Sequence, residues 1–384
     1  RIRVFAPDGE HADALERVHA LLDGLDVKAA STSPPTLEDA FIILLRREQE
    51  VEEEQRTVAQ LTDDPPPADG VAIEARGLTR DFDHFRAVDQ VGFTVRQGDI
   101  FGLLGANGAG KTTVIKMLTG ILPPTDGAGA VAGADMRHAG WAIKERIGYV
   151  SQAFSLYQDM TVRENLRLFA RIYGVPRQHL DARIRRVVEL TGIGKVCDEL
   201  VARLPMGIRQ RLALACALVH GPRVLFLDEP TSGVDPIGRR RFWEILVHLA
   251  RVDGVAILLT THYMSEAEHC DRLALMHAGQ LIADDTPQAL KDALQREAGQ
   301  VLDIAVEPVL QALETLEEAG LGQPALFGRR LHVLAQEVEE TAMRIRAVLA
   351  EHGVRVLEMA VRSPTLEDVF VHRILEREHA EVQR

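Results

Sequence analysis

Short apolar runs alternate with amphipathic helical stretches over residues 71–298, and this alternation is the main structural pattern of the chain. Apolar runs of strand length, separated by helices, are typical of α/β proteins with a mostly parallel sheet. We therefore predict an α/β domain over these residues. The predicted strands are Ile100–Leu104, Ile147–Val150, Val224–Leu227, Val255–Thr260 and Leu273–His277.

The pattern changes after residue 298. Over the last ~85 residues, candidate strands alternate with two candidate helices. We predict a small appended α+β domain over residues 299–384. Its predicted strands are Leu302–Val306, Leu331–Ala335 and Val354–Val361, and its predicted helices lie near Val309–Ala319 and Val338–His352.

The beginning of the chain repeats its end. Residues 24–41 and 353–370 share a constant register, including the string Pro-Thr-Leu-Glu-Asp, which begins at Pro35 and again at Pro364. A recurrence of this kind indicates a duplicated unit. We interpret residues 1–48 as the tail of an upstream copy, so we expect the native polypeptide to be a tandem.

A linker is expected between this tail and the α/β domain. Residues 49–70 contain three consecutive glutamates and three consecutive prolines. Charge followed by a proline run is typical of a solvated linker that is semi-extended at the prolines. The acidic, proline-rich segment therefore separates the upstream tail from the domain that carries the motifs.

Composition narrows the possible partners. The chain has 384 residues, enough for two or three compact units, and its 44 basic and 57 acidic residues give a formal net charge of −13. An acidic chain argues against a general nucleic-acid binder, whose affinity would depend on a basic face. The basic group Arg183, Arg185 and Arg186 is interpreted as a solvated helix face. We expect no nucleic-acid partner.

Cysteine use and hydropathy bear on the compartment. Cys197, Cys216 and Cys270 are odd in number and match no disulfide framework or zinc spacing. Cys216 lies in an apolar run and is predicted to be a buried thiol, which suits a reducing cytoplasm. No stretch approaches the roughly 18 apolar residues that a membrane-spanning helix needs. A role at a membrane would therefore require docking through another subunit.

The most specific motif is a glycine-rich loop that runs from Gly105 to Thr112. It follows a predicted strand and precedes a predicted helix that begins near Thr112, which is the context of a phosphate-binding loop. Its glycines let backbone N–H groups turn toward phosphates, and the helix N-terminus favours negative charge. Lys111 is expected to reach the terminal phosphates, and Thr112 to coordinate Mg²⁺. A purely structural glycine-rich turn is the alternative. The expected nucleotide contacts in the loop are Gly105, Asn107, Gly108, Ala109, Gly110, Lys111, Thr112 and Thr113.

Two carboxylates follow the apolar run Val224–Leu227. An apolar run of this kind predicts a buried central strand, and α/β sheets place their ligands at the carboxyl ends of such strands. Asp228 is expected to hold Mg²⁺ or its water, and Glu229 to polarise the attacking water. On their own the two residues could equally end a surface strand. Their position downstream of a phosphate-binding loop favours the catalytic interpretation.

The segment Asp228 to Pro236, read with the phosphate loop, resembles the nucleotide-binding domain of the ABC superfamily. The resemblance covers about residues 71–291 and implies a P-loop NTPase of the ABC ATPase type with a helical subdomain, ATP as ligand and Mg²⁺ as metal. Gln152 matches the family's glutamine loop, which senses the metal site, and His262 matches the switch histidine near the γ-phosphate. Asp235 matches the loop that couples two nucleotide sites. Phe82 lies where the family stacks an aromatic ring on adenine, although Phe85 is close and core packing could claim either ring.

One motif departs from the family pattern. The family signature, leucine, serine, two glycines, two further residues and glutamine, stands here as Leu204-Pro205-Met206-Gly207-Ile208-Arg209-Gln210. In the family this segment opens a helix and closes on the ATP of the opposite domain. Pro205 supplies neither a hydroxyl nor an N–H, and Met206 adds bulk where glycine allows close approach. Proline suits the first turn of a helix, so we expect the fold to be kept while one set of phosphate contacts is lost.

The altered signature predicts an unequal pair of sites. In a head-to-tail pair it would weaken the site that holds the partner's ATP, while the site built on Lys111, Asp228, Glu229 and His262 would hydrolyse normally. The alternative, in which Pro205 is tolerated and both sites turn over equally, stays open, because one oxygen-stabilising donor contributes only about 2–4 kcal/mol.

The end of the chain resembles a narrower group. A small domain that closes with the segment Ser363 to Phe370 is similar to bacterial exporter ATPases of the antibiotic-resistance and multidrug type, which implies integral membrane permease subunits, a second nucleotide-binding domain and a cytoplasmic position on the inner face of the membrane. Alternatively the string is only a helix cap, with Thr365 as N-cap and Asp368 at the third helical position. The alternative function is a soluble two-cassette ATPase that acts on the ribosome. A DNA-repair or chromosome ATPase would need a long coiled-coil insertion, which the sequence lacks.

Overall fold

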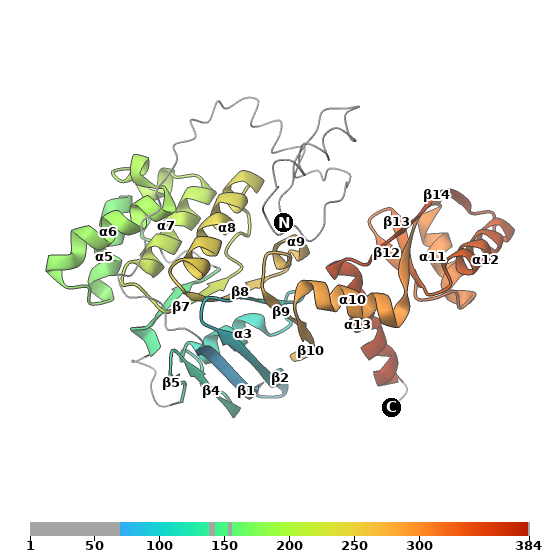
Figure 1. Ribbon diagram of the computed structural model, residues 1–384, viewed down its shortest axis with the longest axis horizontal. Helices are drawn as coiled ribbons and strands as arrows, with labels where there is room; N and C mark the ends of the chain where they lie inside the picture. The colour runs from blue at the N-terminus through green and yellow to red at the C-terminus, as the bar shows by residue number, and fades with distance from the viewer. Residues whose placement is uncertain (1–69, 138–142, 153–155, 383–384) are drawn as a thin grey trace, which may run out of the picture. The chain divides into compact units, whose positions relative to one another are not determined.

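The structure, a computed structural model, describes residues 70–137, 143–152 and 156–382. The chain divides into two compact units, Arg1–Arg56 and Thr57–Arg384. The predicted upstream tail over residues 1–48, and all but the last residue of the predicted linker over residues 49–70, lie outside the described residues. The described part of the second unit forms three β-sheets (Figure 1).

A six-stranded sheet forms the centre of the α/β domain. Its strands are β3 (Ile100–Leu104), β6 (Ile147–Val150), β7 (Val224–Asp228), β8 (Ala256–Thr261), β9 (Arg272–His277) and β10 (Gln280–Asp285). They lie in the order β10-β9-β3-β8-β7-β6, and all neighbours pair in parallel except β9 and β10. The five predicted strands and the mostly parallel sheet are confirmed.

Helices connect these strands and supply the subdomain expected from the sequence. The helices of this domain include α3 (Lys111–Leu118), α5 (Val162–Ile172), α6 (Arg177–Thr191), α7 (Met206–Leu218), α8 (Pro236–Arg251), α9 (Met264–Ala267) and α10 (Pro287–Ala298). Helices α5, α6 and α7 pack together in one hydrophobic cluster. Local signals fix their ends, because Thr161 and Glu164 form a reciprocal capping box at the start of α5, and Gly192 ends α6 in the left-handed conformation.

A second, antiparallel sheet is formed by strands on both sides of β3 in the sequence, and the apolar pattern did not predict it. It consists of β1 (Val71–Phe82), β2 (Phe85–Arg96), β4 (Asp126–Val131) and β5 (Ala134–Asp135), in the order β2-β1-β4-β5. Strand β1 mixes buried apolar residues with charged ones, so it contains no continuous apolar run. Register shifts between β1 and β2 also break the simple alternation that marks a strand with one buried face.

Both faces of the central sheet are buried, because successive residues of β7 point into different cores. Leu225 and Leu227 belong to the cluster that contains helices α5 to α8. Val224 and Phe226 belong to the cluster that contains β1, β2 and α3. Figure 1 shows these two layers on opposite sides of the central strands. Burial on both faces explains why the inner strands β3, β7 and β8 are mostly apolar, whereas the edge strand β10 is partly exposed and ends with two aspartates.

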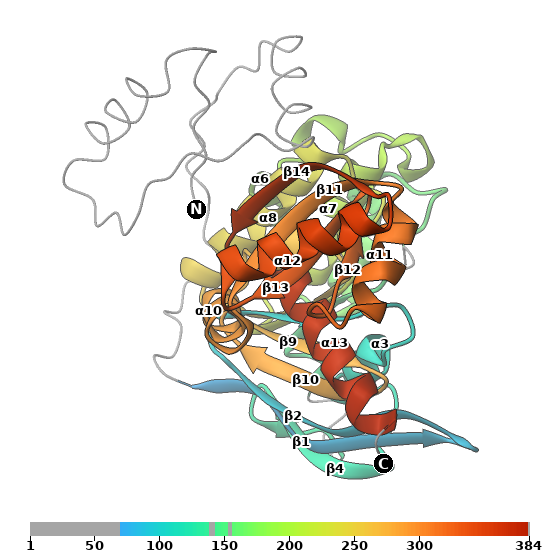
Figure 2. The same cartoon turned by 90° about the vertical axis from the view of Figure 1, so that its right-hand side faces the viewer.

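The appended domain is an α+β unit, as predicted. It consists of β11 (Gln300–Glu307), α11 (Val309–Glu318), β12 (Ala325–Phe327), β13 (Arg330–Ala335), α12 (Val338–Glu351), β14 (Arg355–Arg362) and α13 (Leu366–Val382). The antiparallel sheet has the order β12-β13-β11-β14, and α11 and α12 pack against it (Figure 2). The three predicted strands and two predicted helices are found to within two residues, whereas β12 was not predicted.

The three cysteines are free and buried, which confirms the prediction for Cys216. Burial raises the pKa of the Cys216 and Cys270 thiols, so both side chains stay neutral. Among the described residues, no helix combines the length and the apolar character needed to cross a membrane.

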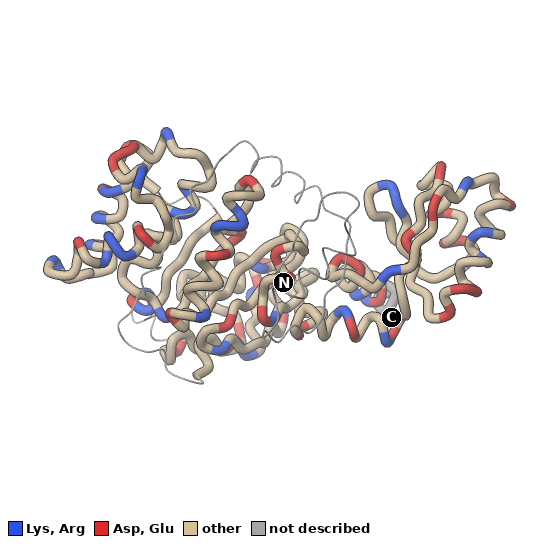
Figure 3. Tube along the Cα trace, turned by 45° about the horizontal axis from the view of Figure 1, so that its top comes forward, with Lys and Arg blue, Asp and Glu red and all other residues tan. Residues whose placement is uncertain are grey.

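Acidic and basic residues are interspersed along the described chain (Figure 3). The predicted solvated basic face on α6 is only partly found. Arg185 is exposed, whereas Arg183 and Arg186 are half-buried. The reason is that α6 packs against α7 with the neighbouring residues Ile184 and Val187, which draws the flanking arginines toward the protein.

The repeated string at the end of the chain begins helix α13, and Asp368 lies at the third helical position, as predicted. The Asp368 carboxylate accepts hydrogen bonds from the backbone N–H and the hydroxyl of Thr365, at 2.8 and 2.6 Å. Arg362 Nη1 donates to the same group at 2.9 Å, and His332 Nδ1 lies 2.8 Å from it. Burial opposes the charge on Asp368, but the hydrogen bonds of His332, Thr365 and Arg362 outweigh burial and hold its pKa well below the ordinary value. The string is therefore a helix cap and an ion-pair centre at once.

We predict that Asp368→Asn lowers the free energy of unfolding at neutral pH by about 2–4 kcal/mol, because it removes the charge from a buried network and leaves Arg362 with the more distant carboxylate of Asp303, at 3.7 Å. Denaturant unfolding followed by circular dichroism measures the change. Glu367→Gln, at the exposed neighbouring position, should be nearly neutral.

The pH dependence supplies the check on this prediction. The pKa of Asp368 is depressed in the folded state, so its stabilisation is present above the unfolded pKa of about 3.9 and is lost as the pH falls below that value. The difference between Asp368→Asn and the unchanged chain should therefore shrink below about pH 4. A difference that stays constant down to pH 2.5 would contradict the assignment.

Candidate nucleotide site

The loop between β3 and α3 is held by close backbone contacts that require glycine. Gly105 adopts φ +157°, and a Cβ atom there would lie 2.2 Å from the carbonyl oxygen of Met276. Gly110 adopts φ +104°, and a Cβ atom there would lie 2.5 Å from the carbonyl oxygen of Ala87. Both glycines therefore let the loop lie against the neighbouring strands, and Lys111 follows as the first residue of α3.

The Lys111 side chain lies back over the loop that carries it. Its Nζ donates to the carbonyl oxygens of Gly105 at 2.8 Å and Ala106 at 3.0 Å, and lies 4.0 Å from Glu229 Oε1. Burial lowers the pKa of Lys111, while the charges of Glu229 and Asp228 raise it. The ammonium group is thus positioned at the loop with two carboxylates as its nearest counter-charges.

Oxygen ligands suited to Mg²⁺ meet at the end of β7. The Thr112 hydroxyl donates to Asp228 Oδ1 at 3.2 Å, although the two residues are 116 positions apart. Asp228 is 2% exposed. Burial of Tyr149, and to a smaller extent the charge of Asp228, raises the pKa of Tyr149 to about 12. The hydroxyl and carboxylate oxygens are the ligand types that Mg²⁺ prefers. The structure therefore brings together Thr112 and Asp228, as the sequence predicts for a metal site.

Glu229 is surrounded by the other residues predicted to be catalytic. Gln152 Nε2 donates to Glu229 Oε2 at 3.0 Å, and His262 Nδ1 lies 3.4 Å from Glu229 Oε1. The Glu229 backbone has φ +48°, an uncommon conformation for a residue other than glycine, and its N–H donates to the hydroxyl of Thr260 at 3.0 Å. Together with Lys111, these side chains bring three segments that are distant in sequence to the Glu229 carboxylate.

The remaining loop residues also lie in place. Asn107 and Gly108 are exposed at the tip of the loop, where a nucleotide could reach them, and Thr113 is half-buried in the first turn of α3. Ala109 is buried, and its carbonyl oxygen accepts from the N–H of Gly279 at 3.1 Å. Ala109 is therefore positioned to contribute only its backbone.

Phe82 lies at the end of β1, next to the turn that leads to β2. Its ring is 41% exposed, and the guanidinium of Arg80 lies 4.6 Å from the ring centroid. Phe85 is 63% exposed. Neither ring is therefore part of the hydrophobic core. Stacking of Phe82 on an adenine stays a prediction.

The altered signature opens helix α7, as predicted, with Pro205 as the residue before the first helical position. The carbonyl oxygen of Pro205 accepts from the N–H groups of Ile208 and Arg209, both at 3.0 Å, so the helix start is intact. Met206 is 41% exposed and projects at the start of the helix. The other signature residues are Leu204 and Gln210, which are buried, and Gly207, which is half-buried.

Asp235 caps helix α8. Its side chain accepts from the N–H of Gly238 at 2.8 Å, and Pro236 occupies the first helical position. The residue is exposed, so it remains accessible to a partner at this end of the helix. Its predicted coupling role is compatible with this position.

The residues of this site are chemically suited to bind a nucleoside triphosphate and Mg²⁺. Cβ atoms at Gly105 and Gly110 would collide with neighbouring backbone atoms. Such a tightly packed glycine loop is typical of sites in which main-chain N–H groups bind phosphate. The groups available for binding are the ammonium group of Lys111, the hydroxyl of Thr112, the carboxylate of Asp228 and the N-terminus of α3. This chemistry suits phosphate oxygens and a hard divalent cation.

Sequence reasoning missed Thr260 as a site residue. It is fully buried in β8, and its hydroxyl donates to Asp228 Oδ1 at 2.6 Å while it accepts the N–H of Glu229. Because one hydroxyl orients both carboxylate residues, Thr260 is a positioning residue of the site. Its only sequence signal is that it is the first of two threonines that end an otherwise apolar strand just before His262.

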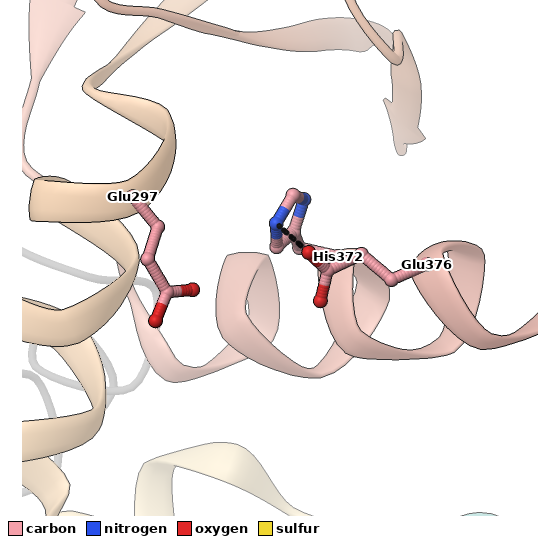
Figure 4. Close-up of side chains that lie close together, drawn as sticks. All are labelled: Glu297, His372 and Glu376. Atoms are coloured by element: carbon pink, nitrogen blue, oxygen red, sulfur yellow. Dashed lines mark ion pairs between the residues drawn. The ribbon is translucent and has the colours of Figure 1, made fainter.

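A second group of possible metal-ligand side chains lies at the appended domain, where Glu297 of α10 approaches His372 and Glu376 of α13 (Figure 4). Arg373 is 2.7 Å from Glu297 and 2.8 Å from Glu376, and His372 Nε2 is 3.2 Å from Glu376. Each carboxylate therefore already has a cationic partner. Ion pairing between α10 and α13 accounts for this group.

Comparison with known proteins agrees with this geometry. A family model described as ABC transporter matches residues 88–232. Nod factor export ATP-binding protein I of Sinorhizobium fredii is 36% identical over 310 residues, which cover 78% of this chain and 85% of that protein. Daunorubicin resistance ATP-binding protein DrrA2 of Streptomyces coeruleorubidus is 31% identical over 306 residues, covering 79% and 95%. The chain therefore belongs to the family of ABC transporter ATP-binding proteins, a class of ATPases.

A longer relative is more similar over a shorter span. Probable multidrug ABC transporter ATP-binding protein YbhF of Escherichia coli is 48% identical over 219 residues, which cover 57% of this chain and 38% of that protein. This chain thus matches well under half of the length of that relative. Among solved structures, cbiO1 of Clostridium perfringens, part of the ABC transporter complex cbiONQ, has a TM-score of 0.54 at 26% identity and covers 59% of this chain and 96% of its own.

We predict that Gly105→Ala weakens MgATP binding by about tenfold or more, because the added Cβ atom must displace the loop from the carbonyl oxygen of Met276. Isothermal titration with MgATP measures the dissociation constant. Gly133→Ala is the matched control, since Gly133 also has positive φ, at +76°, but its Cβ would meet nothing within 4 Å. Equal affinities of the two variants would contradict a role for the close approach at Gly105.

Proposed function

We propose that this chain binds MgATP at the loop of residues 105–113 and hydrolyses it, with Glu229 as the base that activates water. The observation that carries the proposal is the convergence of Lys111, Gln152 and His262 on the Glu229 carboxylate. A carboxylate at the end of a central strand, beside a phosphate loop, is suitably placed to accept a proton from an attacking water.

Each neighbour of Glu229 has a distinct part in this proposal. Gln152 donates to one carboxylate oxygen, so the other oxygen is oriented toward His262 and Lys111. His262 and Lys111 supply positive or hydrogen-bonding groups for the terminal phosphate, where negative charge develops. Thr112 and Asp228 would hold Mg²⁺, which neutralises phosphate charge when it is bound.

The proposal includes a second cassette as partner, in the same full-length chain, and an unequal pair of sites. Pro205 and Met206 stand at the exposed start of α7, where the family signature would meet the partner's nucleotide. Pro205 has no N–H to donate, and the Met206 side chain occupies space next to it. The site that uses this signature would therefore hydrolyse ATP slowly, while the site built on Glu229 turns over.

We further propose that the chain works on the cytoplasmic face of a membrane and energises permease subunits of a multidrug or small-molecule exporter. The support comes from the relatives, whose names refer to Nod factor export, daunorubicin resistance and multidrug transport. A role on the ribosome has no observation in its favour. The nucleotide-driven closure of two cassettes would supply the work.

We predict that Glu229→Gln lowers ATP turnover of the full-length protein by at least about 100-fold, because the amide keeps the shape of the carboxylate but does not accept a proton from water. Phosphate release at saturating MgATP measures turnover, and the dissociation constant for MgATP should change little. Glu244→Gln removes a surface carboxylate on α8 and serves as the control.

The same experiment tests the unequal pair. If the site with the altered signature is slow, Glu229→Gln removes nearly all turnover of the assembly. A variant that kept half of the turnover would show that both sites hydrolyse equally. A variant with full turnover would remove Glu229 from the proposed chemistry altogether.

We predict that the tagged full-length protein, purified from its native membranes in mild detergent, carries integral membrane subunits with it. Mass spectrometry of the purified material would identify polypeptides with several apolar spans. Recovery with ribosomal proteins instead, in the absence of any membrane subunit, would overturn the exporter role.

A further inference from the structure

A buried carboxylate lies behind the catalytic residues. Glu266 belongs to the short helix α9, which begins two residues after His262, and it is only 2% exposed. Burial raises its pKa, while hydrogen bonds from Thr231 and Thr261 and the charges of Arg239 and His262 lower it. A carboxylate at this depth needs partners, because burying an unpaired charge is costly.

The partners of Glu266 come from different parts of the chain. The Thr231 hydroxyl donates to Glu266 Oε1, across 35 positions of sequence. Arg239 Nε lies 3.5 Å from the same oxygen. Thr231 is 1% exposed, so its contact with Glu266 is shielded from water. The resulting contact is short-range, polar and dry, which are the conditions under which a hydrogen-bond network holds its members most firmly.

Each partner belongs to a segment that carries a predicted site residue. Thr231 lies in the turn that follows Glu229, in which the Ser232 N–H donates to the Glu229 carbonyl oxygen at 3.2 Å. Arg239 lies in the first turn of α8, where its N–H donates to the Asp235 carbonyl oxygen at 2.9 Å.

The third segment is the one that contains Glu266 itself. The guanidinium of Arg239 lies 4.7 Å from the centroid of the Tyr263 ring, and the Tyr263 ring packs on His262 at 4.2 Å between centroids. The N–H of Glu266 donates to the carbonyl oxygen of Tyr263 at 3.1 Å. Arg239 therefore contacts the His262 segment both through Glu266 and through Tyr263.

We propose that Glu266 is a positioning residue that ties the segments of Glu229, Asp235 and His262 into one unit. The proposal rests on the proposed function, because it assigns Glu266 to the machinery of ATP hydrolysis. Asp235 is exposed and accessible to a partner cassette, whereas Glu229 and His262 face the nucleotide. Displacement of Asp235 by a partner is then passed to both residues through Arg239, Glu266 and Thr231.

The first test compares steady-state kinetics of the full-length protein. Thr231→Val removes only the hydroxyl and keeps the shape, and Glu266→Ala removes the carboxylate. Both should lower kcat by about tenfold or more with little change in KM for MgATP, because they disturb the alignment of residues that act on bound nucleotide. Glu266→Gln keeps an oxygen that can accept a hydrogen bond from Thr231, so its kcat should lie between that of Glu266→Ala and that of the unchanged protein. Glu268→Gln, on the exposed side of the same region and paired with Lys291, is the control and should keep the original kcat.

The second test uses no nucleotide. Hydrogen exchange followed by mass spectrometry should show faster exchange of residues 262–268 in Thr231→Val, and of residues 228–236 in Glu266→Ala, because each substitution releases the segment on the far side of the contact. In Glu268→Gln both segments should exchange as in the unchanged protein.

The double variant separates a shared link from two independent effects. If Thr231 and Glu266 act through one contact, the combined loss of kcat should be close to the larger single loss instead of the product of both. Unchanged kcat and exchange in Thr231→Val would overturn the proposal even if Glu266→Ala fails to fold. Full activity of the Glu266 variants, with turnover still strongly lowered by Glu229→Gln, would overturn this inference alone, whereas full turnover in Glu229→Gln would overturn the proposed function.

Discussion

The parallel register of four central strands is the constraint on which the rest of the structure depends. Strands β3, β6, β7 and β8 end at the same edge, where Leu104 is level with Thr261, and Val150 with Leu227. The residues at or just beyond the ends of these strands are the phosphate loop after β3, Gln152 after β6, Asp228 and Glu229 at the end of β7, and His262 after β8. Parallel pairing therefore gathers four sequence segments into one site, and burial of both faces of the sheet keeps that register fixed.

At this edge of the sheet, charged groups lie close together, and burying any of them without a partner would cost free energy. Lys111, Asp228 and Glu229 are largely shielded from water, and each lies close to an opposite charge or a hydrogen-bonding group. Since a buried charge is stabilised by such partners, these contacts help to fix the positions of the three side chains. The same reasoning extends behind the site to Glu266, whose partners belong to the segments of Glu229 and Asp235.

The fold keeps the altered signature without visible distortion. Pro205 suits the position just before α7, and its carbonyl oxygen accepts two N–H groups of the first turn. The change at Pro205 and Met206 therefore alters the exposed surface at the start of α7 and leaves the beginning of the helix intact. In the proposed pair, this cassette would keep its own ATP site and alter the site of the opposite domain, because the two sets of residues lie on separate elements.

The sequence by itself determined the parallel strands, the phosphate loop and the acidic pair, because each depends on a continuous run of residues whose apolar pattern or glycine spacing is local. It did not reveal β1 and β2, whose charged residues and register shifts hide the alternation, nor the exposure of Phe82. Only the tertiary structure decided that Thr260 orients both Asp228 and Glu229, and that Glu266 contacts Thr231. These contacts join residues more than 30 positions apart, through side-chain directions that follow from packing and that no local pattern encodes.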